Sequence, residues 1–185
     1  MNNLDLKIPS LISQRLILRP FKLSDAKEVQ RQAGSSKIAS TTGAVPHPYL
    51  DGMAEDWISK HHEWFKEGLA VNWAIVLKES DNIVGSISFG LNQIHNRAEL
   101  GYWVGEEFWN KGYCSEAAVE AIRYGFKELA LNKITSRHMS ENPSSGKVMQ
   151  KAGMTKEGYL KQDVSRNGKF VDLVIYGLLR EEFQI

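Results

Sequence analysis

The alternation of apolar and polar side chains predicts strands in two parts of the chain. In the first part, residues 71–77, 83–91 and 98–104 form three short runs rich in β-formers, and a polar turn at 79–82 joins the first two. Runs joined so closely predict an antiparallel meander. Ahead of them, residues 15–19 form a short apolar run that is halted by a proline, as suits the end of a first strand.

The second part comprises residues 133–139 and a C-terminal hairpin over 159–164 and 170–178. The tripeptide Arg166-Asn167-Gly168 separates the two hairpin runs, and Asn-Gly is typical of a two-residue hairpin turn.

Apolar residues that recur every three or four positions predict helices between these strands. One helix is expected over 25–32, where Asp25 and Glu28 have the spacing of a capping box and Gly34 follows the end. A second amphipathic helix is expected over 51–68, with Asp51 as its cap.

Two further helices are expected later in the chain. Residues 115–129 place apolar and small side chains on one face, and a short helix is framed by Pro143 at its start and Gly153 after its end. Residues 34–50 contain two prolines and many small polar residues and are expected to form a loop. The predicted fold class is mixed α/β (α+β), with a largely antiparallel sheet of about seven strands and helices on both faces.

Length and composition narrow the classes of protein. A chain of 185 residues suits a single domain over 1–185, and 23 Lys plus Arg against 22 Asp plus Glu give no support for direct nucleic-acid binding. The lone Cys114 excludes an internal disulfide and a thiolate-rich metal site, and no metal is expected. The N-terminus lacks a secretory pattern and no run is apolar enough to cross a membrane, so a cytoplasmic location is expected.

Candidate chemistry lies where the third meander strand gives way to a helix. Gly112 and the small Cys114 leave the helix start open, and Lys111 adds a positive charge beside it. The first turn of a helix presents unpaired N–H groups, which bind phosphate when no side chain blocks the approach. A glycine turn and a helix cap occur in many proteins, so this pattern alone does not identify the phosphate ligand.

The order of several motifs along nearly the whole chain resembles the GCN5-related N-acetyltransferase (GNAT) superfamily, and within it the RimJ/RimL-like group of ribosomal-protein N-terminal acetyltransferases. The motifs are Ser13-x-Arg15-Leu16-x-Leu18-Arg19, residues 98–104, residues 109–117, Asn142-x-x-Ser145 leading to residues 151–154, and residues 158–159 and 172–176. The superfamily's phosphate signature is Gln/Arg-x-x-Gly-x-Gly/Ala, from which this chain departs with Trp109 and Cys114. Trp109 is familiar in the RimJ/RimL-like group, and Cys114 keeps the site small.

The resemblance implies an acetyl-CoA site on this unit. Backbone amides between Lys111 and Ser115 are expected to hold the pyrophosphate, the strand end at 102–104 to pair with the pantetheine arm, and Asn142 to contact the same arm. The expected cofactor-binding residues are Tyr102, Trp103, Val104, Lys111, Gly112, Tyr113, Cys114, Ser115 and Asn142.

The same resemblance implies direct attack of an amine on the thioester, with Glu99 as the candidate general base. The alternative is that Glu99 is a solvated strand residue or pairs with Arg97 or another cation. Many members use a tyrosine as the acid where this chain has Met149. The resemblance points to Ser145 instead, although Ser145 also suits a plain helix cap.

The expected acceptor is a primary amine, foremost a protein or peptide N-terminal α-amine such as that of a ribosomal protein. An α-amine with a pKa of about 8 is roughly one-tenth neutral at pH 7, whereas a lysine amine near 10.4 is almost wholly charged, so the α-amine needs less help from a base. Two alternatives stay open: a small-molecule amine (antibiotic, polyamine or amino acid), and a non-catalytic acyl-CoA-binding protein. The protein is expected to be a monomer or a homodimer.

Overall fold

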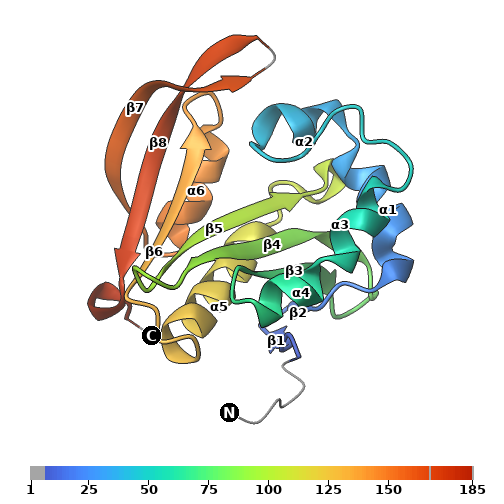
Figure 1. The fold of residues 1–185 in the computed structure, drawn as a ribbon, viewed down its shortest axis with the longest axis horizontal. Coiled ribbons are helices and arrows are strands. Elements are labelled where there is room, and N and C mark those ends of the chain that lie inside the picture. The colour runs from blue at the N-terminus through green and yellow to red at the C-terminus, as the bar shows by residue number, and fades with distance from the viewer. Residues whose placement is uncertain (1–6, 167, 185) are drawn as a thin grey trace.

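The computed structural model describes residues 7–166 and 168–184, which build one eight-stranded sheet with helices on both faces (Figure 1). The strands are β1 (Leu11–Ile12), β2 (Leu16–Arg19), β3 (Ala70–Leu77), β4 (Ile83–Asn92), β5 (Arg97–Val104), β6 (Lys133–Met139), β7 (Thr155–Arg166) and β8 (Lys169–Leu179). Their order in the sheet is β1-β2-β3-β4-β5-β6-β8-β7, and only β5 and β6 run parallel to each other. The predicted fold class is therefore confirmed.

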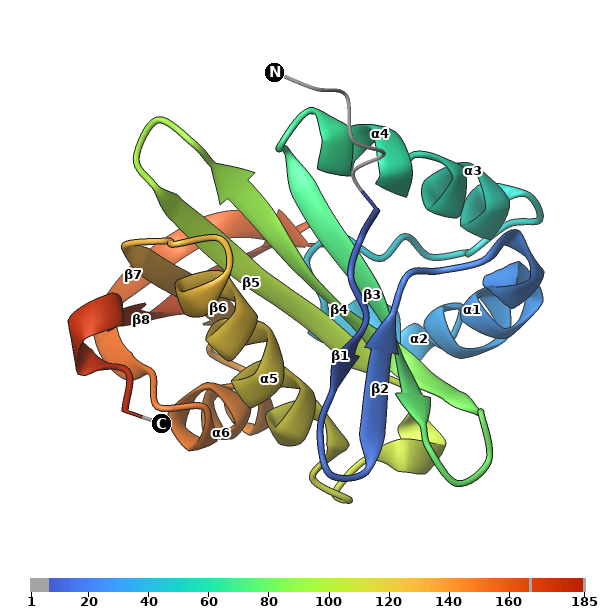
Figure 2. The ribbon, with the colours of Figure 1, turned by 90° about the horizontal axis from the view of Figure 1, so that it is seen from below.

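Within residues 7–166 and 168–184 there are six α-helices, and Figure 2 shows how they are arranged about the sheet. They are α1 (Ala26–Ala33), α2 (Ser36–Thr41), α3 (Met53–Ser59), α4 (His61–Lys66), α5 (Tyr113–Lys127) and α6 (Pro143–Lys151). The large core lies under α5, where Ala118, Ile122 and Gly125 pack against Phe89 of β4 and Ile134 of β6. On the opposite face, α1 and α3 share a smaller apolar cluster.

The eighth strand is β1, in which only Leu11 and Ile12 pair with β2. Two residues are too few for an alternating pattern, so this strand gives no signal in the sequence. The three meander strands, β6 and α6 lie where they were predicted. The C-terminal hairpin also forms, with longer strands than expected, and Asn167 of its predicted turn lies outside the described residues.

The helical predictions on the N-terminal side need four corrections. The predicted cap Asp51 is wrong, because α3 begins after Gly52, which is its N-cap. The predicted loop 34–50 contains α2, which Ser35 caps by accepting the N–H of Lys37. The predicted helix 51–68 is two helices, α3 and α4, that meet at Lys60. The predicted capping box at Asp25 is wrong, because the Asp25 carboxylate binds Arg19 and the N–H of Lys22 instead.

Strands β5 and β6 pair over only part of their length. Arg97, Ala98 and Glu99 face Lys133, Ile134 and Thr135, and no later residue pairs across the two strands. The last link is the Ser136 hydroxyl, which donates to the Leu100 carbonyl at 2.8 Å. Beyond this point the backbones of the two strands part (Figure 1). None of the helices in the described part of the chain has the length and apolar character needed to cross a membrane.

Candidate active site

The start of α5 presents free main-chain amides beside the parted strands. Gly112 caps the helix with φ +80°, a left-handed conformation that residues with a side chain rarely adopt. The first ladder bond runs from the N–H of Glu116 to the carbonyl of Gly112 at 3.1 Å. The N–H groups of Tyr113, Cys114 and Ser115 thus precede the ladder and are available to an anion.

An ion pair from the far end of the chain braces this turn. Arg15 donates from Nε to Glu116 at 2.7 Å and from its guanidinium to the carbonyl of Lys111 at 3.0 Å. A Cβ on Gly112 would lie 3.4 Å from the same guanidinium. Burial raises the pKa of Glu116, but the N–H of Arg15, the hydroxyl of Ser13 and the guanidinium together bring it below its usual range. The carboxylate therefore stays ionised, and the Arg15 guanidinium compensates its negative charge where a phosphate would approach.

The edge of β5 directs main-chain groups into the gap. The carbonyls of Ala98 and Leu100 accept from β6, and the N–H of Gly105 points the other way, to β4. Because the N–H and C=O of one strand residue point to the same side, Tyr102 and Val104 direct theirs toward the gap. The indole of Trp109 donates to the Val104 carbonyl at 2.6 Å and fixes this strand end.

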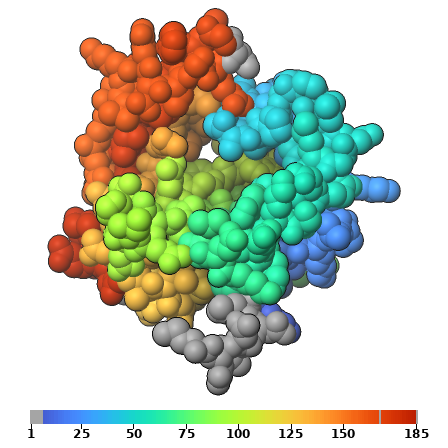
Figure 3. Space-filling model, in the orientation of Figure 1, coloured from blue at the N-terminus to red at the C-terminus, as the bar shows by residue number. Residues whose placement is uncertain are grey.

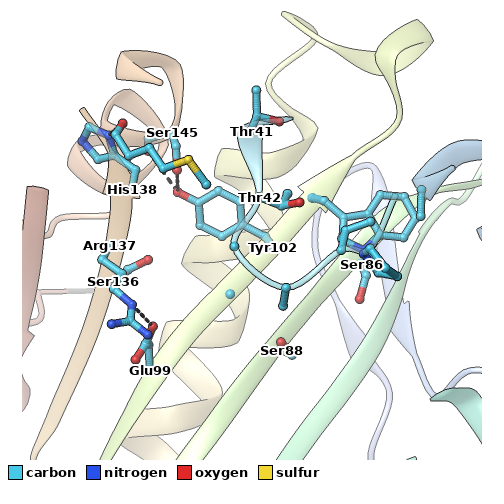
Figure 4. A pocket seen from close by; sticks show the side chains of 18 of the residues that line it. Thr41, Thr42, Ser86, Ser88, Glu99, Tyr102, Ser136, Arg137, His138 and Ser145 are labelled. Atoms are coloured by element: carbon cyan, nitrogen blue, oxygen red, sulfur yellow. Dashed lines mark hydrogen bonds and ion pairs between the residues drawn. The ribbon is translucent and has the colours of Figure 1, made fainter. Parts of the chain in front are cut away.

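Tyr102 and Ser145 meet across the gap. The Tyr102 hydroxyl lies 2.9 Å from both the carbonyl and the hydroxyl of Ser145 in the first turn of α6 (Figure 4). Burial raises the pKa of the Tyr102 phenol well above its usual range, so the phenol keeps its proton near neutral pH. Asn142 is the cap of α6, since its side chain accepts the N–H of Ser145 at 3.3 Å.

Glu99 forms an ion pair with Arg137 of β6, with 2.8 Å between carboxylate and guanidinium (Figure 4). Both side chains are about half exposed, and both line the pocket described next. The cation that pairs with Glu99 is thus Arg137 and not Arg97, and the role of Glu99 as a general base stays a prediction. A paired carboxylate at the pocket wall can still accept a proton from a ligand.

A pocket of about 910 Å³ occupies the face of the sheet opposite α5 and reaches Tyr102 and Ser145 through the gap. Residues 36–46, which comprise α2 and the start of the loop after it, are called the α2 segment below. Figure 3 shows the hollow between this segment and the β7–β8 hairpin. Its floor is formed by β3, β4 and β5, and its walls include Tyr49, Trp57 and Trp103. The parted strands thus lie between the α5 turn on one face and a large pocket that reaches Tyr102 and Ser145 from the other.

The roof of the pocket is fastened by Arg166 at the end of β7. Its guanidinium donates to the carbonyls of Ala39, Gly43 and Val45, in and after α2. On the same side, the Asn142 amide donates to the carbonyl of Thr41 at 3.3 Å. The α2 segment is therefore held over the pocket by contacts with the C-terminal part of the chain.

The predicted site residues lie in three places. Residues 111–115 lie together at the α5 turn, and Tyr102 and Ser145 touch each other at the gap. Glu99 lies on the pocket face, beside Arg137. Cys114 is partly buried against the core and burial raises its pKa to about 12, so it is a neutral thiol and no nucleophile.

Sequence reasoning missed Arg15, Arg137 and Arg166 as members of the site. Arg15 lies in a motif that was noticed, but nothing in that motif reveals its contact with Glu116 about 100 residues later. Arg137 gave a usable signal. Thr135 of β6 pairs with Glu99, and Arg137, two residues further along the strand, is on the same face of the sheet as Glu99. Arg166 gave none, because its partners are main-chain carbonyls.

The sheet parts beside an open helix start and has a large pocket on its other face, and comparison with known families assigns this fold. The family model for the acetyltransferase (GNAT) domain matches residues 15–155. The chain therefore belongs to the GNAT acetyltransferase family.

Relatives of known name support this assignment. YdaF of Bacillus subtilis, provisionally named a ribosomal N-acetyltransferase, is 36% identical over 181 residues, covering 94% of this chain and 96% of YdaF. The [ribosomal protein uS5]-alanine N-acetyltransferase of Escherichia coli is 29% identical over 119 residues, covering 63% of this chain and 61% of that enzyme. The resemblance to RimJ/RimL-like enzymes is thereby confirmed, and the chain is an N-acetyltransferase.

Solved structures agree on the fold. An acetyltransferase of the GNAT family from Bacillus anthracis superimposes with a TM-score of 0.84 at 27% identity, covering 94% of this chain and 99% of that one. RimL, a ribosomal L7/L12 α-N-protein acetyltransferase in complex with coenzyme A, gives a TM-score of 0.82 at 20% identity, covering 93% of this chain and 97% of RimL.

Proposed function

We propose that the chain acts as one acetyltransferase domain, which uses acetyl-CoA to acetylate the N-terminal α-amine of a protein or peptide. The observation that carries the proposal is the parting of β5 and β6. On one face of the sheet the parted strands adjoin the start of α5, whose free amides can bind an anion, and on the other face they adjoin the large pocket. An acyl donor and an amine can each be held on one face and meet at the opening.

The residues of the α5 turn fit the pyrophosphate of CoA. Tyr113, Cys114 and Ser115 supply free amides, Gly112 leaves the approach open, and Lys111 adds charge. The N–H and C=O of Tyr102 and the N–H of Val104 suit the amide-bearing pantetheine arm, while the Val104 carbonyl already accepts from Trp109. When bound, acetyl-CoA supplies the activated acetyl group. The CoA-bound RimL structure, which shares the fold, supports this assignment.

The side chains at the opening suit the two proton movements of acetyl transfer. Glu99, on the pocket face, is placed to take a proton from an incoming ammonium group, and Arg137 keeps the carboxylate oriented. Tyr102 holds a proton on its phenol oxygen beside the Ser145 hydroxyl, and this pair is placed to protonate a departing thiolate. Ser145 is thus bonded to Tyr102 as well as lying in the first turn of α6.

An α-amine is favoured over other amines by two arguments. A base held in an ion pair is a modest one, and an α-amine with a pKa of about 8 needs less help than a lysine near 10.4. In addition, relatives YdaF and the E. coli enzyme carry names that refer to ribosomal proteins.

An acceptor panel tests the proposal. Thiol release from acetyl-CoA is measured with peptides that have a free α-amine, with the same peptides blocked at the α-amine but containing lysine, and with small polyamines. Release is expected with the first set alone. Turnover confined to polyamines, or CoA-induced thermal stabilisation without any turnover, would contradict the proposal.

A further inference from the structure

One cross-strand row of the pocket floor is polar and lies level with the opening in the sheet. Asn72 of β3 pairs with Ser88 of β4, and Ser88 pairs with Gly101 of β5. Gly101 is on the same face as Glu99 and is two residues beyond it, where β5 has no β6 partner. All three residues line the pocket, and Figure 4 shows Ser88 on its floor.

Asn72 is buried, and its amide nitrogen is left without a hydrogen-bond partner among the described residues. The side chain is 5% exposed. Buried polar groups are nearly always paired, and a leucine would fill the same volume without the cost of desolvating an amide. Retaining an amide here therefore calls for a role outside the fold.

Gly101, at the end of the row, has no side chain, so the space above the row is continuous with the space beside Glu99. A Cβ at Gly101 would lie 3.4 Å from the Ser88 hydroxyl, within the space above the row. With strands about 4.8 Å apart, Ser88 is about 5 Å and Asn72 about 10 Å from Gly101. An amine held beside Gly101 and Glu99 would direct the next few atoms of its own residue along the row.

The charged residues that line the pocket determine which kind of acceptor side chain can bind beside Asn72 and Ser88. Asp56 and Glu99 line the pocket, and each is already paired with a cation, Asp56 with Lys60 at 2.6 Å and Glu99 with Arg137 at 2.8 Å. Ser86, at 3% exposed, adds a second hydroxyl to the floor. The floor itself offers amide and hydroxyl groups, which both donate and accept hydrogen bonds.

We propose that Asn72 and Ser88 form a subsite for an uncharged side chain, a carboxamide or a hydroxyl, on the first residue of the acceptor. The subsite rests on the proposed function, since it places that residue by its reacting α-amine. An apolar side chain would leave the Asn72 amide unpaired, and a charged one would lose its hydration on a floor that offers it only neutral groups.

Three tetrapeptides that differ only in a first residue of Asn, Leu or Asp test the subsite, because these side chains have nearly the same size. Competition assays give relative kcat/KM, and calorimetry with CoA present gives binding even where no acetylation occurs. The unchanged protein is expected to prefer Asn over both others by about tenfold to a hundredfold. Equal treatment of the Asn and Leu peptides, or binding of none of the three, would overturn the subsite.

Variants then assign the preference to the row. Asn72→Leu is expected to abolish the preference for Asn over Leu and to leave the KM for acetyl-CoA unchanged, and Ser88→Ala to reduce the preference. Asn82→Leu, at the exposed turn of the same hairpin, is the matched control and should behave as the unchanged protein.

Thermal unfolding separates a binding role from a structural one. Asn72→Leu is expected to unfold at the same or a higher temperature, because an unpaired buried amide is removed. A lower unfolding temperature with an unchanged peptide preference would show that the amide serves the fold, and would overturn the subsite. If only lysine side chains or polyamines are acetylated, the proposed α-amine function fails, while peptide binding by calorimetry still reports on Asn72.

Discussion

The α5 turn and the pocket on the opposite face are built by different means. The turn is local in sequence, since β5 and the start of α5 follow each other directly, and it offers mainly backbone amides. The pocket gathers side chains from α1, α3, β3 to β8 and the loop after α2. A binding site made of backbone depends on conformation, whereas one made of side chains depends on which residues distant segments bring together. The two regions should therefore respond differently to substitution.

The largest effect is expected from Gly112→Val, which breaks the backbone site. A β-branched side chain disfavours φ +80° and would crowd Arg15, so CoA affinity is expected to fall at least a hundredfold. CoA-induced thermal stabilisation measures this effect. Gly52→Val is the matched control, because Gly52 also has a positive φ but faces open space at the cap of α3. Undiminished CoA stabilisation in Gly112→Val would remove the pyrophosphate from this turn.

Glu99→Gln should separate chemistry from cofactor binding. Loss of the base is expected to lower kcat roughly a hundredfold and to move the pH profile of turnover toward higher pH, with the KM for acetyl-CoA unchanged. Steady-state rates between pH 6 and pH 10, as a suitable test range, measure both effects. Glu157→Gln, which breaks the exposed pair with Lys133, serves as the control. A pH profile identical to that of the unchanged protein would leave Glu99 as a structural partner of Arg137.

Tyr102→Phe and Ser145→Ala test whether the two hydroxyls act as a unit. Each variant is expected to lower kcat about tenfold to thirtyfold, and the double variant should lose little more than either alone, as for coupled residues. Single-turnover thiol release is the measurement. Fully additive losses would mean that the 2.9 Å contact between the two hydroxyls has no part in proton transfer.

Arg166→Met should affect the acceptor region alone. Without the guanidinium, the carbonyls of Ala39, Gly43 and Val45 lose their common donor, and the roof over the pocket loosens. The KM for a peptide acceptor is expected to rise severalfold, while the KM for acetyl-CoA stays the same. Lys161→Met, on the exposed part of the same strand, is a suitable control. An equal rise in both KM values would show that the roof also shapes the cofactor site.

The smallest effect on turnover is expected at His61, which supports the pocket wall by packing against Trp57 at 4.3 Å between ring centroids. Burial lowers the pKa of His61 to about 4, and neither ring nitrogen has a partner among the described residues. An unfolded chain takes up this proton near pH 6.5, so stability is lost as the pH falls from 6.5 toward 4, by up to about 3 kcal/mol. Urea unfolding at pH 7.5 and pH 5 measures the loss.

His61→Phe should remove this pH dependence, and His62→Phe, on the exposed side of α4, should retain it. Because His61 packs on the pocket side and the α5 turn lies on the opposite face of the sheet, CoA affinity per folded molecule should be the same in both variants. A pH dependence that persists in His61→Phe would assign the acid sensitivity to other groups.

The same contrast explains how much the sequence could predict. The meander, β6, α6 and the glycine turn were predicted because each is specified by a few neighbouring residues, such as Gly112 before α5. The break at Lys60 was missed because the apolar spacing of α3 continues into α4, and β1 was missed because two residues show no period. Pocket residues such as Asn72 and Arg166 gave no signal, since an amide in a strand and an arginine at a turn are ordinary until the fold places them together.

The hydrogen bonds from Arg166 to three carbonyl oxygens have a consequence for how the acceptor specificity of the enzyme can evolve. Every residue type carries a main-chain carbonyl, so Ala39, Gly43 and Val45 can be exchanged without loss of the hydrogen bonds to Arg166, provided that the backbone follows the same path. The side chains of this segment that face the pocket can then diversify under selection for new acceptors, while the anchor is inherited unchanged. A descendant could change its amine through a few exchanges in one short segment and keep its acyl donor.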